Sequence, residues 1–184
     1  YFDRDEYLSI MRGAGINMMR FKGGKGHTGL LDSTLATFFP NQWINYDERM
    51  RKLRKADIRI FYGIFGNKIA NGAFGSSINN DQKRLIEYSI SRWGAYVDVW
   101  QLTNENKAPY SWTQSAAAYV KLMDPYQHTV CESYYWYETP AAILAFPEID
   151  LHAPHWYKRE SEYDSDTVTV GNASFWKTAG KPVF

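Results

Sequence analysis

Along its whole length, the sequence alternates between segments in which apolar residues recur at helical spacing and short apolar runs typical of β-strands. The strand-like runs lie at residues 16–21, 58–65, 97–102, 129–135, 149–155 and 181–184. Helix-like segments precede them at residues 3–13, 45–55, 81–94, 112–123, 140–146 and 168–179. No signal for a hairpin turn lies between consecutive strand-like runs. The alternation therefore predicts βαβ units and a parallel sheet covered by helices.

Two parallel architectures fit this pattern, an open doubly wound sheet and a closed (β/α)₈ barrel. A doubly wound nucleotide-binding sheet carries a Gly-x-Gly-x-x-Gly turn between its first strand and helix. The glycine cluster at 23–26 lacks this spacing, and a polar loop and Pro40 follow it rather than a helix. Six units over 184 residues give about 31 residues each, so eight would need about 245, close to a typical barrel. We predict an α/β fold, a (β/α)₈ TIM barrel of which residues 1–184 form one partial domain.

The composition argues against several classes of partner. With 21 Lys and Arg against 20 Asp and Glu, the chain lacks the basic surplus that nucleic-acid binding normally requires. The longest apolar runs are far shorter than the roughly 20 residues of a membrane helix. A single cysteine, Cys131, excludes an internal disulfide framework and a cysteine-based zinc site. His152 and His155 lie three residues apart on one predicted strand, so their side chains are expected to point to opposite faces and cannot easily bind one metal ion. We therefore expect no nucleic-acid or membrane partner, no metal and no cofactor.

The ends of the predicted strands carry the residues suited to chemistry, because functional residues of a parallel barrel lie where strands end. Asn104 and Glu105 directly follow the strand at 97–102. A partly shielded carboxylic acid there could donate a proton to a leaving oxygen, and the amide could bind a substrate hydroxyl. The same pair could instead cap a turn and lie in solvent. Arg20, at the end of the first strand, could hold a neighbouring carboxylate ionised or form an ordinary ion pair.

The order of these motifs resembles glycoside hydrolases of the large barrel clan that contains cellulases, β-mannanases and β-galactosidases. In that clan an Arg ends the second strand, Asn-Glu ends the fourth, and His-x-Tyr often ends the sixth. Arg20, Asn104–Glu105 and the pair His155 and Tyr157 occupy these places when the strands are counted as second to seventh. The resemblance covers essentially the whole chain and implies a partial catalytic barrel domain.

The resemblance also implies the roles of these residues. Glu105 is expected to be the acid/base, Asn104 the partner of a sugar hydroxyl, and Arg20 the residue that orients the nucleophile. His155 and Tyr157 are expected to neighbour the catalytic pair, although both could be structural core residues. The clan's nucleophile ends the seventh strand, so a Glu is expected two to four residues beyond Phe184. The implied activity is retaining hydrolysis of a β-linked polysaccharide or oligosaccharide, and the implied location is extracellular or periplasmic.

The 31 aromatic residues suit a carbohydrate ligand, because Tyr and Trp present a flat apolar face with a polar tip. Trp136 and Trp156, at strand ends, are candidate sugar platforms or packing residues, whereas Trp100 is expected to fill the barrel. Two alternatives stay open: a carbohydrate-binding barrel without the second carboxylate, and a lyase or aldolase. The second would need a Schiff-base lysine at a strand end; no predicted strand places one there, and Lys22 comes closest. The sequence predicts no oligomeric state.

Overall fold

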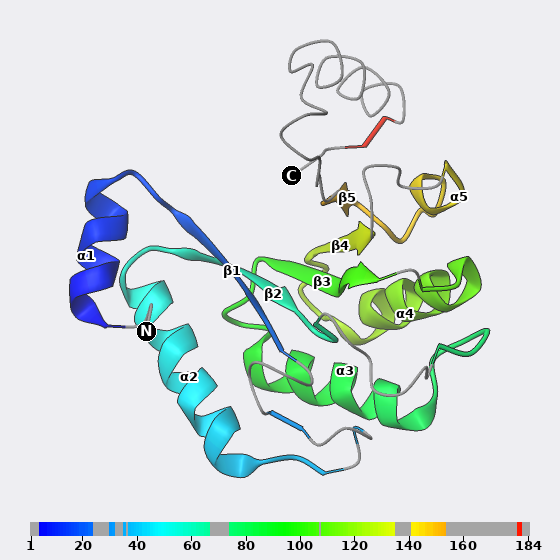
Figure 1. Cartoon of the computed structure of the whole chain (residues 1–184), viewed down its shortest axis with the longest axis horizontal. Coiled ribbons are helices and arrows are strands. Elements are labelled where there is room, and N and C mark those ends of the chain that lie inside the picture. Colours follow the sequence, from blue (N-terminus) through cyan, green and yellow to red (C-terminus); the bar gives the residue numbers. More distant parts are fainter. Residues whose placement is uncertain are drawn as a thin grey trace, which may run out of the picture.

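The computed structural model describes residues 4–23, 30–31, 35, 37–66, 74–106, 108–134, 141–153 and 180–181. Its strands are β1 (Met18–Lys22), β2 (Arg59–Gly63), β3 (Val99–Asn106), β4 (Thr129–Tyr134) and β5 (Leu151–His152). Its helices are α1 (Asp5–Gly13), α2 (Pro40–Lys55), α3 (Asn80–Trp93), α4 (Tyr110–Met123) and α5 (Ala141–Leu144). The strands form one sheet in the order β1-β2-β3-β4-β5, and every neighbouring pair is parallel (Figure 1). A sheet whose order never reverses is the wall of a (β/α)₈ barrel, which confirms the predicted fold class.

The predicted elements that fall on described residues are confirmed except at their ends. Helix α2 begins at Pro40, earlier than expected, because Pro is well suited to the first helical turn. Strand β3 continues to Asn106, past the predicted end, and β5 is limited to Leu151–His152. Helix α3 starts with a capping box between Asn79 and Gln82, and its buried face matches the predicted apolar stripe. The predicted helix at 168–179, and the predicted strand at 181–184 except residue 181, lie outside the described residues.

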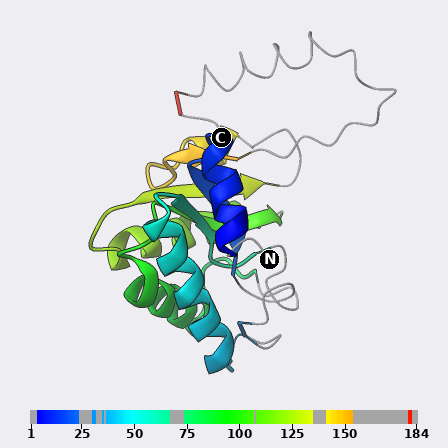
Figure 2. The same ribbon diagram turned by 90° about the vertical axis from the view of Figure 1, so that its left-hand side faces the viewer.

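The two faces of the sheet bury different residues. Helices α2, α3 and α4 cover one face (Figure 2), and Trp43, Trp93 and Trp100 belong to the large core beneath them. The other face, which a closed barrel would enclose, carries a small cluster of Phe61, Val99, Cys131 and Ala153.

The expectation that Trp100 fills the barrel is wrong. Trp100 faces the helices, and its Nε1 donates a hydrogen bond to Asp124 Oδ2 at 3.2 Å. The reason is the alternation of side chains along a strand, which turns Val99 and Gln101 to the interior and the residue between them outward.

Glycines close the loops at the carboxyl ends of β1 and β2. The backbone N of Gly23 donates to the backbone O of Gly63 at 2.6 Å, and a Cβ on Gly23 would lie 1.8 Å from Tyr62 Oη. Gly66 has a φ of +65°, and a Cβ there would lie 2.6 Å from the backbone O of Gly23. The two loops therefore approach more closely than residues with side chains would allow, at the edge where the candidate functional residues lie.

Candidate active site

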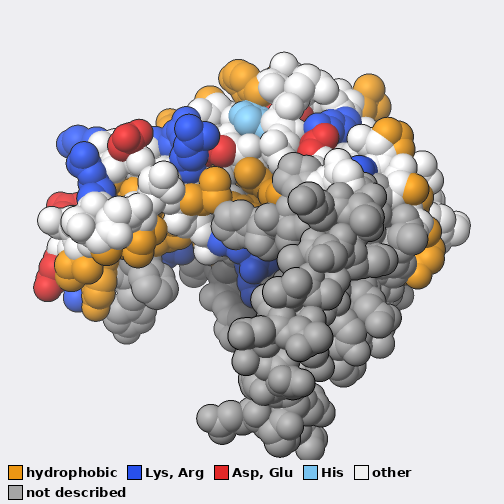
Figure 3. All heavy atoms as spheres, turned by 90° about the horizontal axis from the view of Figure 1, so that it is seen from above, with side chains coloured by type: hydrophobic (Ala, Val, Ile, Leu, Met, Phe, Trp, Pro, Cys, Tyr) orange, Lys and Arg blue, Asp and Glu red, His pale blue; other side chains and the backbone are white. Residues whose placement is uncertain are grey.

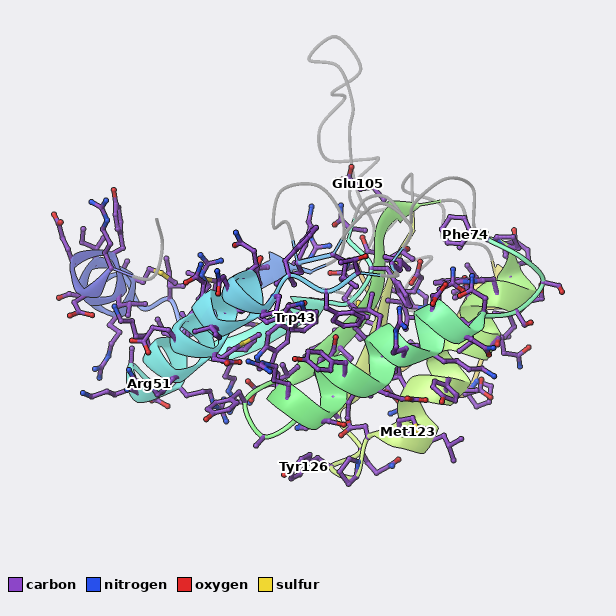
Figure 4. The ribbon with its side chains drawn as sticks, turned by 90° about the horizontal axis from the view of Figure 1, so that it is seen from below. Trp43, Arg51, Phe74, Glu105, Met123 and Tyr126 are labelled. Atoms are coloured by element: carbon purple, nitrogen blue, oxygen red, sulfur yellow. The ribbon has the colours of Figure 1, made fainter. Side chains whose placement is uncertain are left out.

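Glu105 lies at the carboxyl end of the parallel strands, which is the functional end of a (β/α)₈ barrel. In Figure 4 it stands at the tip of β3, on the side opposite Met123 and Tyr126, which precede β4. Its side chain is half-buried, and its φ of 54° lies in the left-handed region that residues with a side chain rarely adopt. Backbone strain of this kind is concentrated at functional sites.

Arg20 connects three strands at this end of the sheet. Its Nε donates to Gln101 Oε1 at 2.7 Å, and its Nη2 donates to Asn104 Oδ1 and, at 3.4 Å, to Ser133 Oγ. The guanidinium carbon also lies 5.5 Å from the centre of the Phe61 ring. Arg20 therefore lies on the interior face of the sheet, where a residue that orients a catalytic carboxylate would have to be. The structure brings Arg20 and Asn104 into direct contact.

Asn104 is fully buried and held by its backbone as well as by Arg20. Its backbone N donates to the backbone O of Gly66 at 2.9 Å. The amide is thus fixed by the loop after β2 and by the guanidinium from β1. This places a rigid polar group directly beside Glu105.

Lys22 adds a second cation to this region, and the expectation that no strand ends in a lysine is wrong. β1 continues through Lys22, because its pairing with β2 extends to Gly63. Burial and the nearby charge of Arg20 lower the pKa of Lys22, while Glu105 acts in the opposite direction. Figure 3 shows basic side chains in the hollow beside the α1 end of the molecule. Lys22, Arg20 and Glu105 therefore form one electrostatic group.

The other sequence-predicted site residues lie outside the described residues. They are His155 and Tyr157, predicted to neighbour the catalytic pair, and the predicted sugar platforms Trp136 and Trp156. Their roles stay predictions.

Two other acidic residues of the β4 and β5 region, Asp150 and Glu132, are engaged by neighbouring groups. Asp150 Oδ2 accepts from the backbone N of Val130 at 2.7 Å and forms an ion pair with Lys121 at 2.6 Å. Glu132 has no exposed surface, and Thr103 Oγ1 donates to its Oε1 at 2.5 Å. Neither arrangement leaves a carboxylate directed at a substrate.

Sequence reasoning missed Gln101, Ser133 and the contact between Thr103 and Glu132. One signal was available: a polar residue inside an otherwise apolar strand is normally hydrogen-bonded when it is buried. Gln101 and Glu132 are both of this kind, and both are fully buried.

Two buried titratable residues on neighbouring strands have pKa values shifted in opposite senses. Burial raises the pKa of Glu132 from its ordinary 4.5 to about 7, although hydrogen bonds from Thr103 offset part of the rise. Burial, aided by the charge of Lys181, lowers the pKa of His152 from 6.5 to about 4. Both ring nitrogens of His152 are buried and without a hydrogen-bond partner in the described part of the chain. The burial of each residue favours its uncharged form.

These shifts predict opposite effects of pH on stability. Glu132 contributes stability that is present below pH 4.5 and lost as pH rises to about 7, because the folded state binds the extra proton. His152 contributes stability that is present above pH 6.5 and lost as pH falls to about 4. Each contribution is about 3 kcal/mol of unfolding free energy. Urea unfolding should be measured from pH 4 to 7.5. As pH rises, the unfolding free energy of wild type should fall by this amount relative to that of Glu132→Gln. Over the same range it should rise by this amount relative to that of His152→Leu. Parallel curves for wild type and either variant would contradict the assignment for that residue.

Comparison with known proteins gives a result at the level of the fold. No protein-family model matches the sequence, and no curated protein matches it. Among solved structures, the endo-β-1,4-mannanase from Thermotoga petrophila superposes with a TM-score of 0.70 and 14% identity, over 96% of this chain and 55% of that chain. The endo-1,4-β-mannanase from Rhizomucor miehei gives 0.71 and 14%, over 97% and 70%. A glycoside hydrolase family 5 protein from Bacteroides vulgatus gives 0.73 and 13%, over 97% and 43%.

These structural similarities establish the class of fold. The chain has the (β/α)₈-barrel fold of family 5-like glycoside hydrolases, and it spans 55% of the length of the Thermotoga petrophila enzyme. In the described ranges, no helix is both long and apolar enough to cross a membrane. No group of three or more His, Cys, Asp or Glu residues that could hold a metal ion occurs in those ranges.

Proposed function

We propose that this chain carries the acid/base half of a retaining glycoside hydrolase that cleaves a β-linked polysaccharide or oligosaccharide. The observation that carries the proposal is the arrangement at the carboxyl ends of β1 and β3. There Glu105 follows an Asn104 that Arg20 holds from across the sheet. The barrel fold shared with family 5 glycoside hydrolases supports the same reading.

In the proposed mechanism Glu105 first protonates the glycosidic oxygen as a second carboxylate attacks the anomeric carbon. The C–O bond to the leaving sugar breaks, and a covalent glycosyl-enzyme intermediate forms. Glu105, now ionised, then removes a proton from a water molecule that displaces the carboxylate. Asn104 is proposed to bind a sugar hydroxyl and Arg20 to orient the second carboxylate, which we place a few residues beyond Phe184. The two carboxyl groups of a retaining enzyme lie about 5–5.5 Å apart.

The proposed substrate class is taken from the activities of the structurally similar proteins. Two of them are endo-β-1,4-mannanases, and a family 5 mannosidase from Rhizomucor miehei was solved with mannosyl-fructose. β-1,4-Mannan is therefore the first polysaccharide to test, with cellulose oligosaccharides second. A polysaccharide-degrading enzyme meets its substrate outside the cell, so we propose a secreted protein.

The proposal predicts hydrolysis with retention. The complete protein, meaning the natural polypeptide that contains residues 1–184, should release reducing ends from a β-linked glycan. Proton NMR at early times should show the β-anomer of the product first, because two displacements restore the original configuration. First appearance of the α-anomer would exclude the double displacement, and absence of hydrolysis across β-linked glycans would exclude the hydrolase.

Two alternatives have distinct outcomes in the same experiment. A carbohydrate-binding barrel would bind glycan, measured by calorimetry, without releasing reducing ends. The position of Lys22 at the end of β1, with a lowered pKa, favours a Schiff-base lyase or aldolase as the second candidate function. Borohydride reduction in the presence of a small ketone or aldehyde substrate would then add mass at Lys22. A hydrolase should show no such adduct.

A further inference from the structure

Strand β3 departs from regular pairing just before it delivers Asn104 and Glu105. Its register with β4 shifts between Gln101 and Asn104, and again between Asn104 and Asn106. An irregularity of this kind disrupts the hydrogen-bond ladder locally and changes the direction of nearby side chains. The orientation of the candidate catalytic pair therefore depends on the contacts that fix residues 102–106, the β3 bulge.

Glu132 contacts the β3 bulge from the neighbouring strand. Its Oε1 accepts from Thr103 Oγ1 at 2.5 Å, and its Oε2 accepts from the backbone N of Thr103 at 3.3 Å. Both residues are fully buried, so the backbone N–H of Thr103 needs an acceptor that water cannot supply. Among the described residues, the carboxyl group of Glu132 makes hydrogen bonds to Thr103 alone. This carboxyl group thus supplies the acceptor that regular strand pairing would otherwise provide.

The opposite edge of the bulge is fixed by backbone contacts. From the segment after β2, Phe65 N donates to Leu102 O at 3.0 Å, and Gly66 O accepts from Asn104 N at 2.9 Å. Glu105, with its φ of 54°, keeps a strained conformation only if the structure around it is rigid. The bulge is therefore held on both sides, and Glu132 is the side chain that holds it on the β4 side.

We propose that Glu132 is a positioning residue, whose two hydrogen bonds to Thr103 fix the β3 bulge and so direct Asn104 and Glu105 into the barrel mouth. Side chains alternate along β4, so Cys131 and Ser133 face the interior and Glu132 faces away from the substrate side. Its effect on catalysis must pass through the backbone of β3. The catalytic consequence rests on the proposed hydrolase function, whereas the holding of the bulge does not.

The test uses Thr103→Val in the complete protein, because Val keeps the shape of Thr and removes only the hydroxyl donor. Hydrogen exchange measured by mass spectrometry should accelerate about tenfold in residues 102–106, the factor expected for one lost hydrogen bond. The value of kcat should fall roughly 10- to 100-fold with KM within about threefold, because misplaced catalytic groups slow chemistry more than binding. Thr103→Ser retains the hydroxyl and should restore both measurements to within about threefold of wild type.

Asp124→Asn supplies the matched control. Asp124 is also a buried carboxylate, but it lies at the other end of the sheet and accepts from the backbone N of His128 at 2.8 Å. This variant should lower global stability while leaving kcat per folded molecule and the relative exchange of residues 102–106 unchanged.

The exchange measurement decides the proposal. If residues 102–106 exchange no faster in Thr103→Val than in Asp124→Asn, Glu132 does not hold the bulge and the proposal is wrong, whatever the activity. If exchange accelerates and kcat is unchanged, the proposed effect of the β3 bulge on catalysis is overturned. If exchange accelerates and the wild-type protein hydrolyses no glycan, the holding role stands and the proposed function fails.

Discussion

Replacing Glu105 by Gln is expected to lower kcat of the complete protein on a natural β-linked glycan by roughly 10²–10⁴-fold, the usual worth of general acid–base catalysis. Gln has nearly the same shape as Glu but has no carboxyl proton to give to the leaving oxygen. The loss should depend on the leaving group. An aryl glycoside with a dinitrophenolate leaving group needs little protonation, so its first displacement should be nearly as fast as in wild type. The value of kcat/KM, which reports the first displacement, measures this difference when it is determined for both substrates.

The second displacement should be slow for either substrate in Glu105→Gln, because the same carboxylate activates the water. Added azide, which needs no base, should then raise the turnover of the dinitrophenyl glycoside and yield a β-glycosyl azide. Glu48→Gln is the control, because Glu48 is an exposed partner of Arg51 on α2 and should leave kcat unchanged. Turnover of natural glycan by Glu105→Gln within about threefold of wild type would show that the acid/base lies elsewhere.

The order of strands and the meeting of Arg20 with Asn104 were predictable from sequence. Both follow from one rule: parallel strands joined by helices place their carboxyl ends at one edge, so residues at those ends converge. Eighty-four positions separate Arg20 from Asn104, yet their side chains are hydrogen-bonded.

The face on which each strand residue lies was not predictable in the same way. Residues 97–102 read as a mostly apolar run, and both faces of a barrel strand are buried, so polarity does not distinguish inside from outside. Trp100 was assigned to the wrong face for this reason. The irregular pairing of β3 leaves no sequence signal either, because it depends on where the carboxylate of Glu132 meets Thr103. Lys22 was missed since strand length depends on the pairing partner, here Gly63.

Replacing Arg20 by Met is expected to affect both stability and activity strongly. The variant removes two hydrogen-bond donors, Arg20 Nε, which donates to Gln101 Oε1 at 2.7 Å, and Arg20 Nη2, which donates to Asn104 Oδ1. A buried acceptor deprived of its donor costs about 1–3 kcal/mol, and both residues are fully buried. Loss of a fixed charge in the site should lower kcat by roughly 10²–10³-fold. Urea unfolding and steady-state kinetics of the complete protein measure the two effects.

Two further variants separate charge, shape and general destabilisation. Arg20→Lys keeps the charge but cannot present two donors in the fixed fork of a guanidinium, so it should recover part of the stability and little of the activity. Arg54→Met removes an arginine that pairs with Asp98 at 2.9 Å near the protein surface, and it should cost less than about 1 kcal/mol with kcat unchanged. If Arg20→Met lost no more stability and activity than Arg54→Met, the guanidinium would be dispensable at the barrel mouth. The assignment of β1 as the second strand of the barrel depends mainly on Arg20, because it places Arg20 opposite the carboxylate that Arg20 is proposed to orient. That assignment would then lose its main support.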